Sequence, residues 1–283
     1  MNVSAKTMEH QRTCISGPGR TQTYHLRSAG LQVLLPSDPQ FVESQGSYWS
    51  LSAQPWPACI VLPRSVHDVA AAILLLAEHG WKFTVRSGGH TPHMSKETNG
   101  VTLDLRHMNN VHVNEEDGTA DIGPGARWKD VYAELNRHGR MVAGGREGNV
   151  GVGGLILGGG NTFLTAREGF ACDTVIAFEV ALADGRIITA DSQRHSDLFW
   201  ALKGGSNNFG VVTNFKMKTF EGSNIWGGVT LYPKHTSPQV IQNLTMFTDA
   251  VHTMLDTNML WVFTYTGTSC PKTMFDRVLN DKQ

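Results

Sequence analysis

Hydrophobic positions along this chain come in short blocks, a pattern that predicts many short strands and a few helices. Ala58–Pro63 is expected to form a short buried strand, and Phe83–Val85 is expected to form the next one. Between them, apolar residues at helical spacing from Val66 to Ala77 predict a helix whose start is capped by Ser65 and Asp68. The order strand, helix, strand predicts a β-α-β unit.

The middle of the chain continues with short elements. A helix is expected from about Arg127 to His138, and Asp184-Gly185 is the dipeptide expected in a two-residue hairpin turn. Further expected elements are strands near residues 101–104, 111–113, 120–122, 175–183, 186–190 and 211–219, and a helix near 197–202. Together these elements predict an α+β domain that ends near Phe220.

The two ends of the chain differ from this middle part. The first 55 residues are rich in Ser, Gly, Gln and Pro, and we expect an extended lead-in with little core of its own. After Phe220, the pattern predicts strands at 229–232 and 259–265, an amphipathic helix at 237–255 and the start of a helix at 272–279. Such a fragment would leave apolar faces uncovered, so this second unit is expected to be incomplete.

Composition narrows the class of protein. The chain has 283 residues, of which 40% are hydrophobic and 17% charged, as in ordinary globular proteins. Its net charge is −1 and its basic residues are scattered, which disfavours nucleic acid as a partner. The longest apolar run, Val69 to Ala77, is too short to span a bilayer. The N-terminus has no apolar signal segment, so a cytoplasmic or intracellular protein is expected, or a secreted one if the true start lies elsewhere.

Cysteine and histidine residues give little support for a metal site. The four cysteines form no C-x-x-C pair, which argues against structural zinc and favours buried or idle thiols. The twelve histidines are dispersed, and only His90 and His93 lie close enough in sequence to share a ligand. We therefore expect no metal.

The segment Arg86-Ser87-Gly88-Gly89-His90 is the first candidate for chemistry, because it directly follows a predicted strand. Consecutive glycines let the main chain approach a ligand and turn its N–H groups toward phosphate oxygens. The imidazole of His90 can act as a nucleophile near pH 7. The alternative is a tight turn that carries a surface histidine.

A second candidate is the glycine-rich segment 150–160, where something must need bare backbone, such as a pyrophosphate or a planar ring. The alternative is a loop that is glycine-rich for steric reasons. Two weaker candidates for cofactor contact are the segment 207–213 and the segment Phe170-Ala171-Cys172-Asp173. Neither the G-x-G-x-x-G fingerprint nor a P-loop occurs, which disfavours a nicotinamide dehydrogenase and a P-loop nucleotide hydrolase.

Taken together, these segments resemble the PCMH-type FAD-binding domain of the vanillyl-alcohol-oxidase superfamily, and above all the berberine-bridge-enzyme-like fungal oxidoreductases. The resemblance covers roughly residues 30 to 222 and rests on the order and spacing of several segments. These segments are 85–90, 122–128, 144–146, 151–154, 157–160, 172–173, 182–185 and 204–210. The resemblance implies an FAD-binding domain of two α+β subdomains, followed by an incomplete α+β substrate domain. The chain is thereby divided into a lead-in of residues 1–54, the FAD-binding domain of residues 55–222 and the partial substrate domain of residues 223–283.

The resemblance implies FAD as the cofactor, attached through its 8α-methyl group to His90. The backbone of Arg86, Ser87, Gly88 and Gly89 would hold the pyrophosphate. The other implied cofactor-binding residues are Val152, Gly153 and Gly154 along the flavin, Gly210 and Val212 near the adenine side, and Gly158, Gly159, Cys172 and Asp173. Bicovalent members have a cysteine shortly before the Gly-Val-Gly-Gly segment. Residues 146–150 contain none, so one covalent bond is expected.

The implied activity is the transfer of a hydride from a small organic substrate to FAD, plausible in fungal secondary metabolism, with dioxygen as the oxidant. The resemblance assigns no catalytic base to this chain and leaves alcohol, sugar and amine oxidation and oxidative cyclisation open. It also implies a disulfide between Cys14 and Cys59. The alternative function is a non-catalytic FAD-binding remnant, or a subunit that needs a second chain. The oligomeric state is left open.

Overall fold

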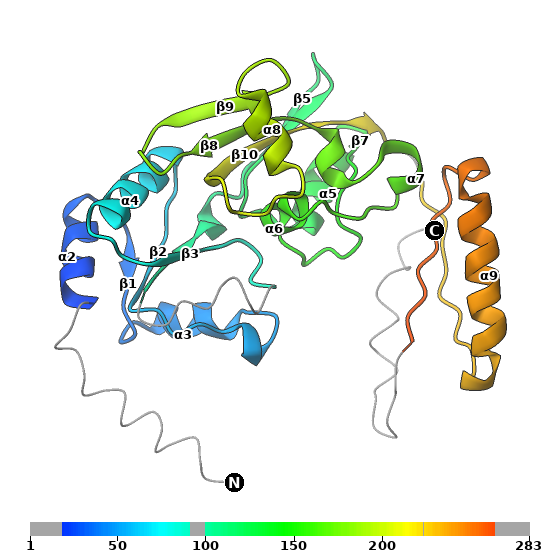
Figure 1. The fold of residues 1–283 in the computed structure, drawn as a ribbon, viewed down its shortest axis with the longest axis horizontal. Coiled ribbons are helices and arrows are strands. Elements are labelled where there is room, and N and C mark those ends of the chain that lie inside the picture. Colours follow the sequence, from blue (N-terminus) through cyan, green and yellow to red (C-terminus); the bar gives the residue numbers. More distant parts are fainter. Residues whose placement is uncertain (1–18, 91–99, 223, 264–283) are drawn as a thin grey trace, which may run out of the picture.

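The computed structural model describes residues 19–90, 100–222 and 224–263. In this part the chain builds two large β-sheets with helices packed on them, and a third sheet of two short strands (Figure 1). The first sheet has the strand order β1-β2-β4-β3. Its strands are β1 (Val33–Leu34), β2 (Cys59–Val61), β4 (Val101–Asp104) and β3 (Phe83–Arg86). β2 and β3 run parallel to β4 on either side of it, and β1 pairs antiparallel with β2.

The predicted β-α-β unit is confirmed, with helix α4 (Val66–Glu78) joining β2 to β3. The backbone N–H of Asp68 donates to Ser65 Oγ at 3.1 Å, and the backbone N–H of Ser65 donates to Asp68 Oδ2 at 3.2 Å. These two bonds form the expected capping box, which satisfies N–H groups that a helix start leaves without helical partners. Gly80, at φ +61°, lies just past the end of the helix.

The second sheet is antiparallel, with the order β5-β6-β10-β8-β9. Its strands are β5 (Val111–Asn114), β6 (Thr119–Ile122), β10 (Val211–Lys218), β8 (Val175–Ala181) and β9 (Ile187–Asp191). The helices on this side are α5 (Trp128–Arg137), α6 (Val152–Leu157), α7 (Thr165–Glu168) and α8 (Ser196–Leu202). The side chains of Trp128, Phe178 and Phe215 are fully buried in its core.

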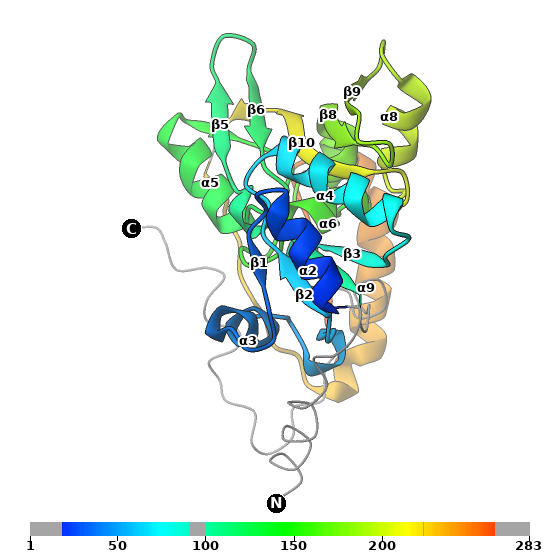
Figure 2. The ribbon, with the colours of Figure 1, turned by 90° about the vertical axis from the view of Figure 1, so that its left-hand side faces the viewer.

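Helix α4 lies between the two sheets. Its buried residues Val69 and Ile73 pack in one cluster with strands of the first sheet, and with Ala181 and Val211 from the second sheet. Figure 2, in which α4 crosses in front of the strands, shows this placement from the side. The shared cluster fixes the two sheets relative to each other, because closely packed side chains leave little freedom to slide.

The expectation of an extended lead-in with little core is wrong for residues 19–54. This stretch forms α2 (Gly19–Ser28), β1, α3 (Pro39–Gly46) and the 3₁₀ turn η1 (Leu51–Ala53). Leu26 and Phe41 have no exposed surface, and β1 extends the first sheet. The stretch has few apolar positions and no clear period, so its structure comes from packing on the rest of the sheet.

The last part of the described chain lies to one side. The short strands β7 (Arg140–Met141) and β11 (Phe220–Glu221) pair, and the chain then continues through η4 (Lys234–Thr236), α9 (Ser237–Ala250) and η5 (Val251–Thr253). α9 confirms the predicted helix, which ends five residues early, and it stands apart from both sheets (Figure 1). Residues 229–232 and 259–263 form no strand, contrary to prediction, because within the described chain no neighbouring strand pairs with them.

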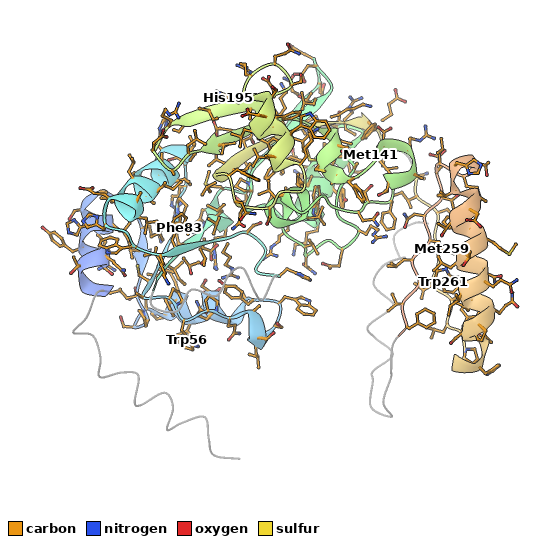
Figure 3. The ribbon with its side chains drawn as sticks, in the orientation of Figure 1. Trp56, Phe83, Met141, His195, Met259 and Trp261 are labelled. Carbon is orange, nitrogen blue, oxygen red and sulfur yellow. The ribbon has the colours of Figure 1, made fainter. Side chains whose placement is uncertain are left out.

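Most large apolar side chains of this last part are exposed, and one aromatic pair joins its segments. Tyr232 and Trp261 have ring centroids 5.6 Å apart, and Met259 and Trp261 lie beside α9, away from the sheets (Figure 3). The predicted helix at 272–279 lies outside the described residues. Within residues 19–90, 100–222 and 224–263, no helix combines the length and apolarity needed to cross a bilayer.

Candidate functional site

A cavity of about 390 Å³ opens where β3 ends, α6 begins and β10 begins. These three places belong to segments far apart in the sequence. β3 and the start of β10 meet in the cluster around α4, and α6 and β10 meet in the core of the second sheet. The described lining residues include no Asp or Glu, so the cavity suits an anionic ligand. The lining consists of Val85, Arg86, Ser87, Gly88, Gly89, His90, Leu105, Pro124, Val150, Gly151, Gly153, Gly154, Leu155, Leu157, Ser206, Asn207, Gly210, Val211, Val212 and Phe215.

The two glycine-rich segments predicted from the sequence touch each other through their backbones. A Cβ placed on Gly88 would lie 2.8 Å from the backbone nitrogen of Gly151, and a Cβ on Gly151 would lie 2.5 Å from that of Gly88. Both distances are far below a normal contact. Glycine is therefore required at both positions, because any side chain would push the two segments apart.

Arg127, which the sequence did not single out as a site residue, ties the same two segments together. Its Nη1 donates to the carbonyl oxygens of Gly88 at 3.1 Å and Asn149 at 2.6 Å. Arg127 stands directly before α5, in a stretch where Gly123, Pro124 and Gly125 form a turn. Ser87 Oγ donates to the Pro124 carbonyl oxygen at 2.6 Å and holds the first segment to this turn.

Glycines in the second segment differ in what surrounds them. A Cβ on Gly153 would lie 3.1 Å from the Pro124 carbonyl oxygen, so this glycine packs against the protein itself. A Cβ on Gly154 would meet no protein atom within 4 Å, although Gly154 lines the cavity. Space of this kind beside bare backbone is what a planar or phosphate-bearing ligand needs for close approach.

The side chain of Arg86 turns away from the cavity into a buried polar cluster. It is 3% exposed, and its Nη1 donates to Asp104 at 3.2 Å and to the Ser44 carbonyl oxygen at 2.9 Å. Nη2 donates to Ser47 Oγ at 2.7 Å, and the guanidinium lies 3.9 Å from the centre of the Tyr48 ring. Burial lowers the pKa of Arg86 and raises that of Tyr48 to about 12. The backbone of Arg86 therefore lines the cavity while its side chain braces the loop from behind.

His90 stands exposed at the end of this loop. Its ring lies beside that of Trp49, with the centroids 5.1 Å apart and the planes inclined by 37°. The backbone N–H of Trp49 donates to the Gly89 carbonyl oxygen at 3.2 Å. No sequence pattern pointed to Trp49, because it lies about 40 residues before the histidine, in the stretch expected to lack a core.

Nine of the predicted site residues line the cavity, and five do not. The nine are Arg86, Ser87, Gly88, Gly89, His90, Gly153, Gly154, Gly210 and Val212. Val152 is fully buried in the core of the second sheet, so its side chain does not reach the cavity. Gly158 and Gly159 follow α6 outside the lining. Cys172 and Asp173 belong to the 3₁₀ turn η3 (Ala171–Thr174), where Asp173 accepts from the backbone N–H of Phe170 at 2.8 Å.

Other sequence candidates also have a place in the structure. Within the described part of the chain, no group of three His, Cys, Asp or Glu residues gathers as a metal site, and His93 lies outside that part. Cys59 is a buried thiol whose pKa is raised by burial to about 11. Its expected disulfide partner, Cys14, lies outside the described residues.

A second cavity, of about 550 Å³, opens on another face between the start of α4 and the second sheet. It contains two carboxylates, but both have partners within the sheet. Asn214 Nδ2 donates to Asp121 Oδ1 at 2.6 Å, and Thr213 Oγ1 donates to Glu179 Oε1 at 2.7 Å. None of the residues predicted to bind a cofactor lines this cavity.

Comparison with known proteins finds that this chain is similar to flavoproteins. Residues 57–191 match the FAD binding domain family. The FAD-dependent monooxygenase sdcF of Emericella nidulans is 42% identical over 254 residues, which cover 88% of this chain and 53% of that protein. The chain spans about half the length of the curated relatives it matches.

Two solved structures illustrate the similarity in fold. Glucooligosaccharide oxidase from Acremonium strictum, described with a 6-S-cysteinyl, 8α-N1-histidyl FAD, is 32% identical, with a TM-score of 0.67 over 71% of this chain and 42% of that one. A variant of BBE-like 1 from Physcomitrella patens is 25% identical, with a TM-score of 0.67 over 71% of this chain and 44% of that one.

Proposed function

We propose that this chain, whose residues 57–191 match the FAD binding domain family, carries the FAD-binding half of an oxidoreductase that oxidises a small organic molecule. The observation that carries the proposal is the cavity between the two sheets. Its lining combines glycine backbone and apolar side chains with a few polar residues such as Ser87, His90 and Asn207. Its described lining residues include no Asp or Glu, and open space lies beside Gly154. These features fit a dinucleotide with a negative pyrophosphate and a flat ring system.

We assign the residues of the cavity to parts of the cofactor. The backbone at Ser87, Gly88 and Gly89 would hold the pyrophosphate, and Gly153 and Gly154 would border the isoalloxazine. Gly210 and Val212 would lie toward the adenine. When bound, FAD supplies the acceptor for a hydride equivalent, and dioxygen returns it to the oxidised state. The protein contributes orientation and exclusion of water.

His90 is proposed to hold the cofactor covalently. One ring nitrogen of His90 would hold the cofactor by a bond to its 8α carbon, and the nitrogen and that carbon would each give up a proton. The two electrons released with these protons would pass to dioxygen, which would become hydrogen peroxide. The exposed position of His90 at the cavity mouth is the observation in favour. A histidyl FAD is also described for the glucooligosaccharide oxidase relative.

Substrate, partners and domain division are further parts of the proposal. A domain of residues 55–222 would bind FAD, and residues 223–283 would begin a substrate domain, with a small molecule and dioxygen as reactants. The matched part of this chain covers 53% of the sdcF relative, so a complete substrate site would need chain beyond that part. A purely FAD-binding role, without turnover, is the second candidate, and the exposed apolar side chains around α9 favour it.

The test begins with the purified protein. The visible spectrum is recorded, the protein is precipitated with acid, and flavin is measured in the pellet and in the supernatant. Yellow colour in the pellet supports covalent FAD, and yellow colour only in the supernatant supports reversible FAD binding. A colourless protein that takes up no added FAD would contradict the assignment. Flavin reduction by candidate substrates, with oxygen uptake and peroxide yield, then separates an enzyme from a flavin-binding remnant.

The matching variant is His90→Ala. Since His90 is exposed, this change should leave the far-ultraviolet circular dichroism and the melting temperature nearly unchanged. Flavin should move from the acid pellet into the supernatant. Flavin that remains in the pellet of this variant would rule out the histidyl bond.

A further inference from the structure

The ring of Trp49 is the feature of this site that the proposed function leaves unexplained. Trp49 is 72% exposed, although a large apolar side chain usually gains by burial. Among the described residues, its recorded aromatic neighbour is His90, at a centroid distance of 5.1 Å. A tryptophan that covers little core but lies against the proposed attachment residue indicates a role in holding that residue.

The position of Trp49 is fixed by the chain on both sides of it. The backbone N–H of Trp49 donates to Gly89, the residue directly before His90. Tyr48, directly before Trp49, lies under the guanidinium of Arg86. Ser44 and Ser47 bind the same guanidinium through hydrogen bonds of 2.7 to 2.9 Å. We call residues 44–49 the clamp segment, because they contact the loop at the side chain of Arg86 and at the backbone of Gly89.

Gly89 shows how closely the clamp segment and the loop fit. It has φ +69°, and a Cβ at this position would lie 3.1 Å from both Arg86 Nε and Tyr48 Cδ1. The loop therefore passes over the clamp segment with no room for a side chain. Because the backbone before His90 is fixed in this way, the remaining freedom of His90 lies mainly in the rotation of its own side chain.

From this geometry we propose that Trp49 is a positioning residue for the covalent attachment of FAD to His90. Its ring restricts the imidazole to the orientations in which it faces the cavity mouth. The proposal rests on the proposed histidyl bond. Bond formation needs the ring nitrogen and the 8α carbon in a narrow range of approach, so lost orientation slows the reaction more than it weakens cofactor binding. The bond chemistry, with dioxygen as the oxidant, is unchanged from that given above.

The experiment compares the rate of attachment in wild type, Trp49→Ala and Trp49→Phe. Each full-length protein is produced flavin-free under riboflavin limitation and mixed with excess FAD. Samples taken over time are denatured, and flavin fluorescence bound to the chain is measured on a gel. Total flavin is measured from the absorbance of the gel-filtered native protein. Trp200→Ala is the matched control, since Trp200 is 78% exposed on α8 and does not line the cavity.

We expect Trp49→Ala to slow attachment by about 3- to 10-fold, with unchanged total flavin, because one aromatic contact is lost. Trp49→Phe should recover most of the rate, since it restores a ring beside His90. Trp200→Ala should match wild type. The ratio of attached flavin to total flavin separates a positioning role from a general effect on stability. A loss of stability would lower attached and total flavin in parallel.

Two results would overturn the inference alone. One is an unchanged attachment rate in Trp49→Ala. The other is an equal fall of attachment and total flavin, which would make Trp49 part of the binding surface. If wild type binds FAD but attaches none, the histidyl bond and the role of Trp49 both fail, while FAD binding stands. If wild type binds no FAD at all, the proposed function itself fails.

Discussion

At the scale of single residues, the glycines of the site fall into two groups that the sequence cannot separate. Gly88 and Gly151 are required by each other, because a Cβ on either would collide with the backbone of the other. A Cβ on Gly154 would meet no protein atom within 4 Å, so the protein itself does not require glycine at this position. Substitutions at the two kinds of position should therefore have different effects.

Gly154→Val should remove FAD binding without harming the fold. Valine is tolerated at a helical position about as well as glycine, and its side chain would enter space that the protein leaves open. Isothermal titration with FAD should show a loss of affinity of at least 10-fold at an unchanged melting temperature. Gly228→Val, at another uncrowded glycine far from the cavity, is the control. Unchanged affinity in Gly154→Val would count against the placement of the isoalloxazine.

Gly151→Ala gives the complementary result. Its Cβ would lie 2.5 Å from the backbone nitrogen of Gly88, so the two segments must separate. We expect a lower free energy of unfolding, by about 1–3 kcal/mol in urea titrations, together with weaker FAD binding. An equally stable Gly151→Ala protein would show that the two segments are not in contact.

The thiol of Cys59 predicts a dependence of stability on pH. Its pKa in the folded chain is raised to about 11, while an unfolded thiol titrates near 8.5. Below the pKa of the unfolded thiol, the folded and the unfolded chain both keep the proton, and the free energy of unfolding is unaffected. Between about pH 9 and pH 11 the unfolded chain loses the proton first, so the free energy of unfolding falls by on the order of 3 kcal/mol.

The measurement is urea unfolding of wild type and Cys59→Ala between pH 7 and pH 11, with reductant present. The difference between the two proteins should shrink as the pH rises, because only wild type contains this thiol. The same titration is repeated without reductant. If the difference in free energy of unfolding between the two proteins then no longer depends on pH, Cys59 is oxidised under those conditions, as a disulfide with Cys14 would require.

At the scale of elements, helix α4 is the clearest case in which local sequence decides structure. Ser65 and Asp68 form the capping box, and Val69 and Ile73 supply the buried face. Ser65→Ala should lower the free energy of unfolding by about 1 kcal/mol, whereas Ser65→Asn should preserve most of it, since asparagine also caps. Urea midpoints give the comparison. Equal effects of the two substitutions would show that the hydroxyl cap does not contribute.

Elements that depend on distant partners were not predictable in the same way. The sequence predicted the β-α-β unit, the hairpin at Gly185 and the strand β10, where period and turn residues agree. It did not predict α6, because glycines at Gly153 and Gly154 argue against a helix. It missed α2 and α3, since their burial depends on packing against β2 and α4. For the same reason Trp49 and Arg127 were absent from the predicted site, because contacts between distant segments leave no local pattern.

At the scale of the whole molecule, the segment that carries α9 is attached to the rest by few contacts. Within the described chain, Arg167 Nε donates to Asp256 at 2.9 Å, and Asn258 bonds with Thr162 and Arg146 at 3.3 Å. Residues 224–233 are exposed and form no helix or strand. Brief digestion with a low-specificity protease should therefore cut first in this stretch.

The same digestion tests where the cofactor is held. The described residues that line the cavity lie between Val85 and Phe215, so the larger fragment should keep its flavin colour after gel filtration. Mass spectrometry identifies the cut. Early cleavage within α4 or β10 instead would contradict the described packing, and loss of flavin with the small fragment would place the cofactor elsewhere.

The cavity walls come from three segments that are distant in sequence, near residues 86–90, 150–154 and 206–212. A ligand seated there joins them as a crosslink would, and any ligand that binds only the folded chain opposes unfolding in proportion to the logarithm of its free concentration. Reversibly bound FAD would therefore protect the protein less on dilution. Once FAD is joined to His90, its local concentration no longer depends on the surroundings. Reversibly bound FAD opposes unfolding only while the cell supplies free cofactor. With the bond to His90, the same opposition to unfolding would be a permanent property of each molecule.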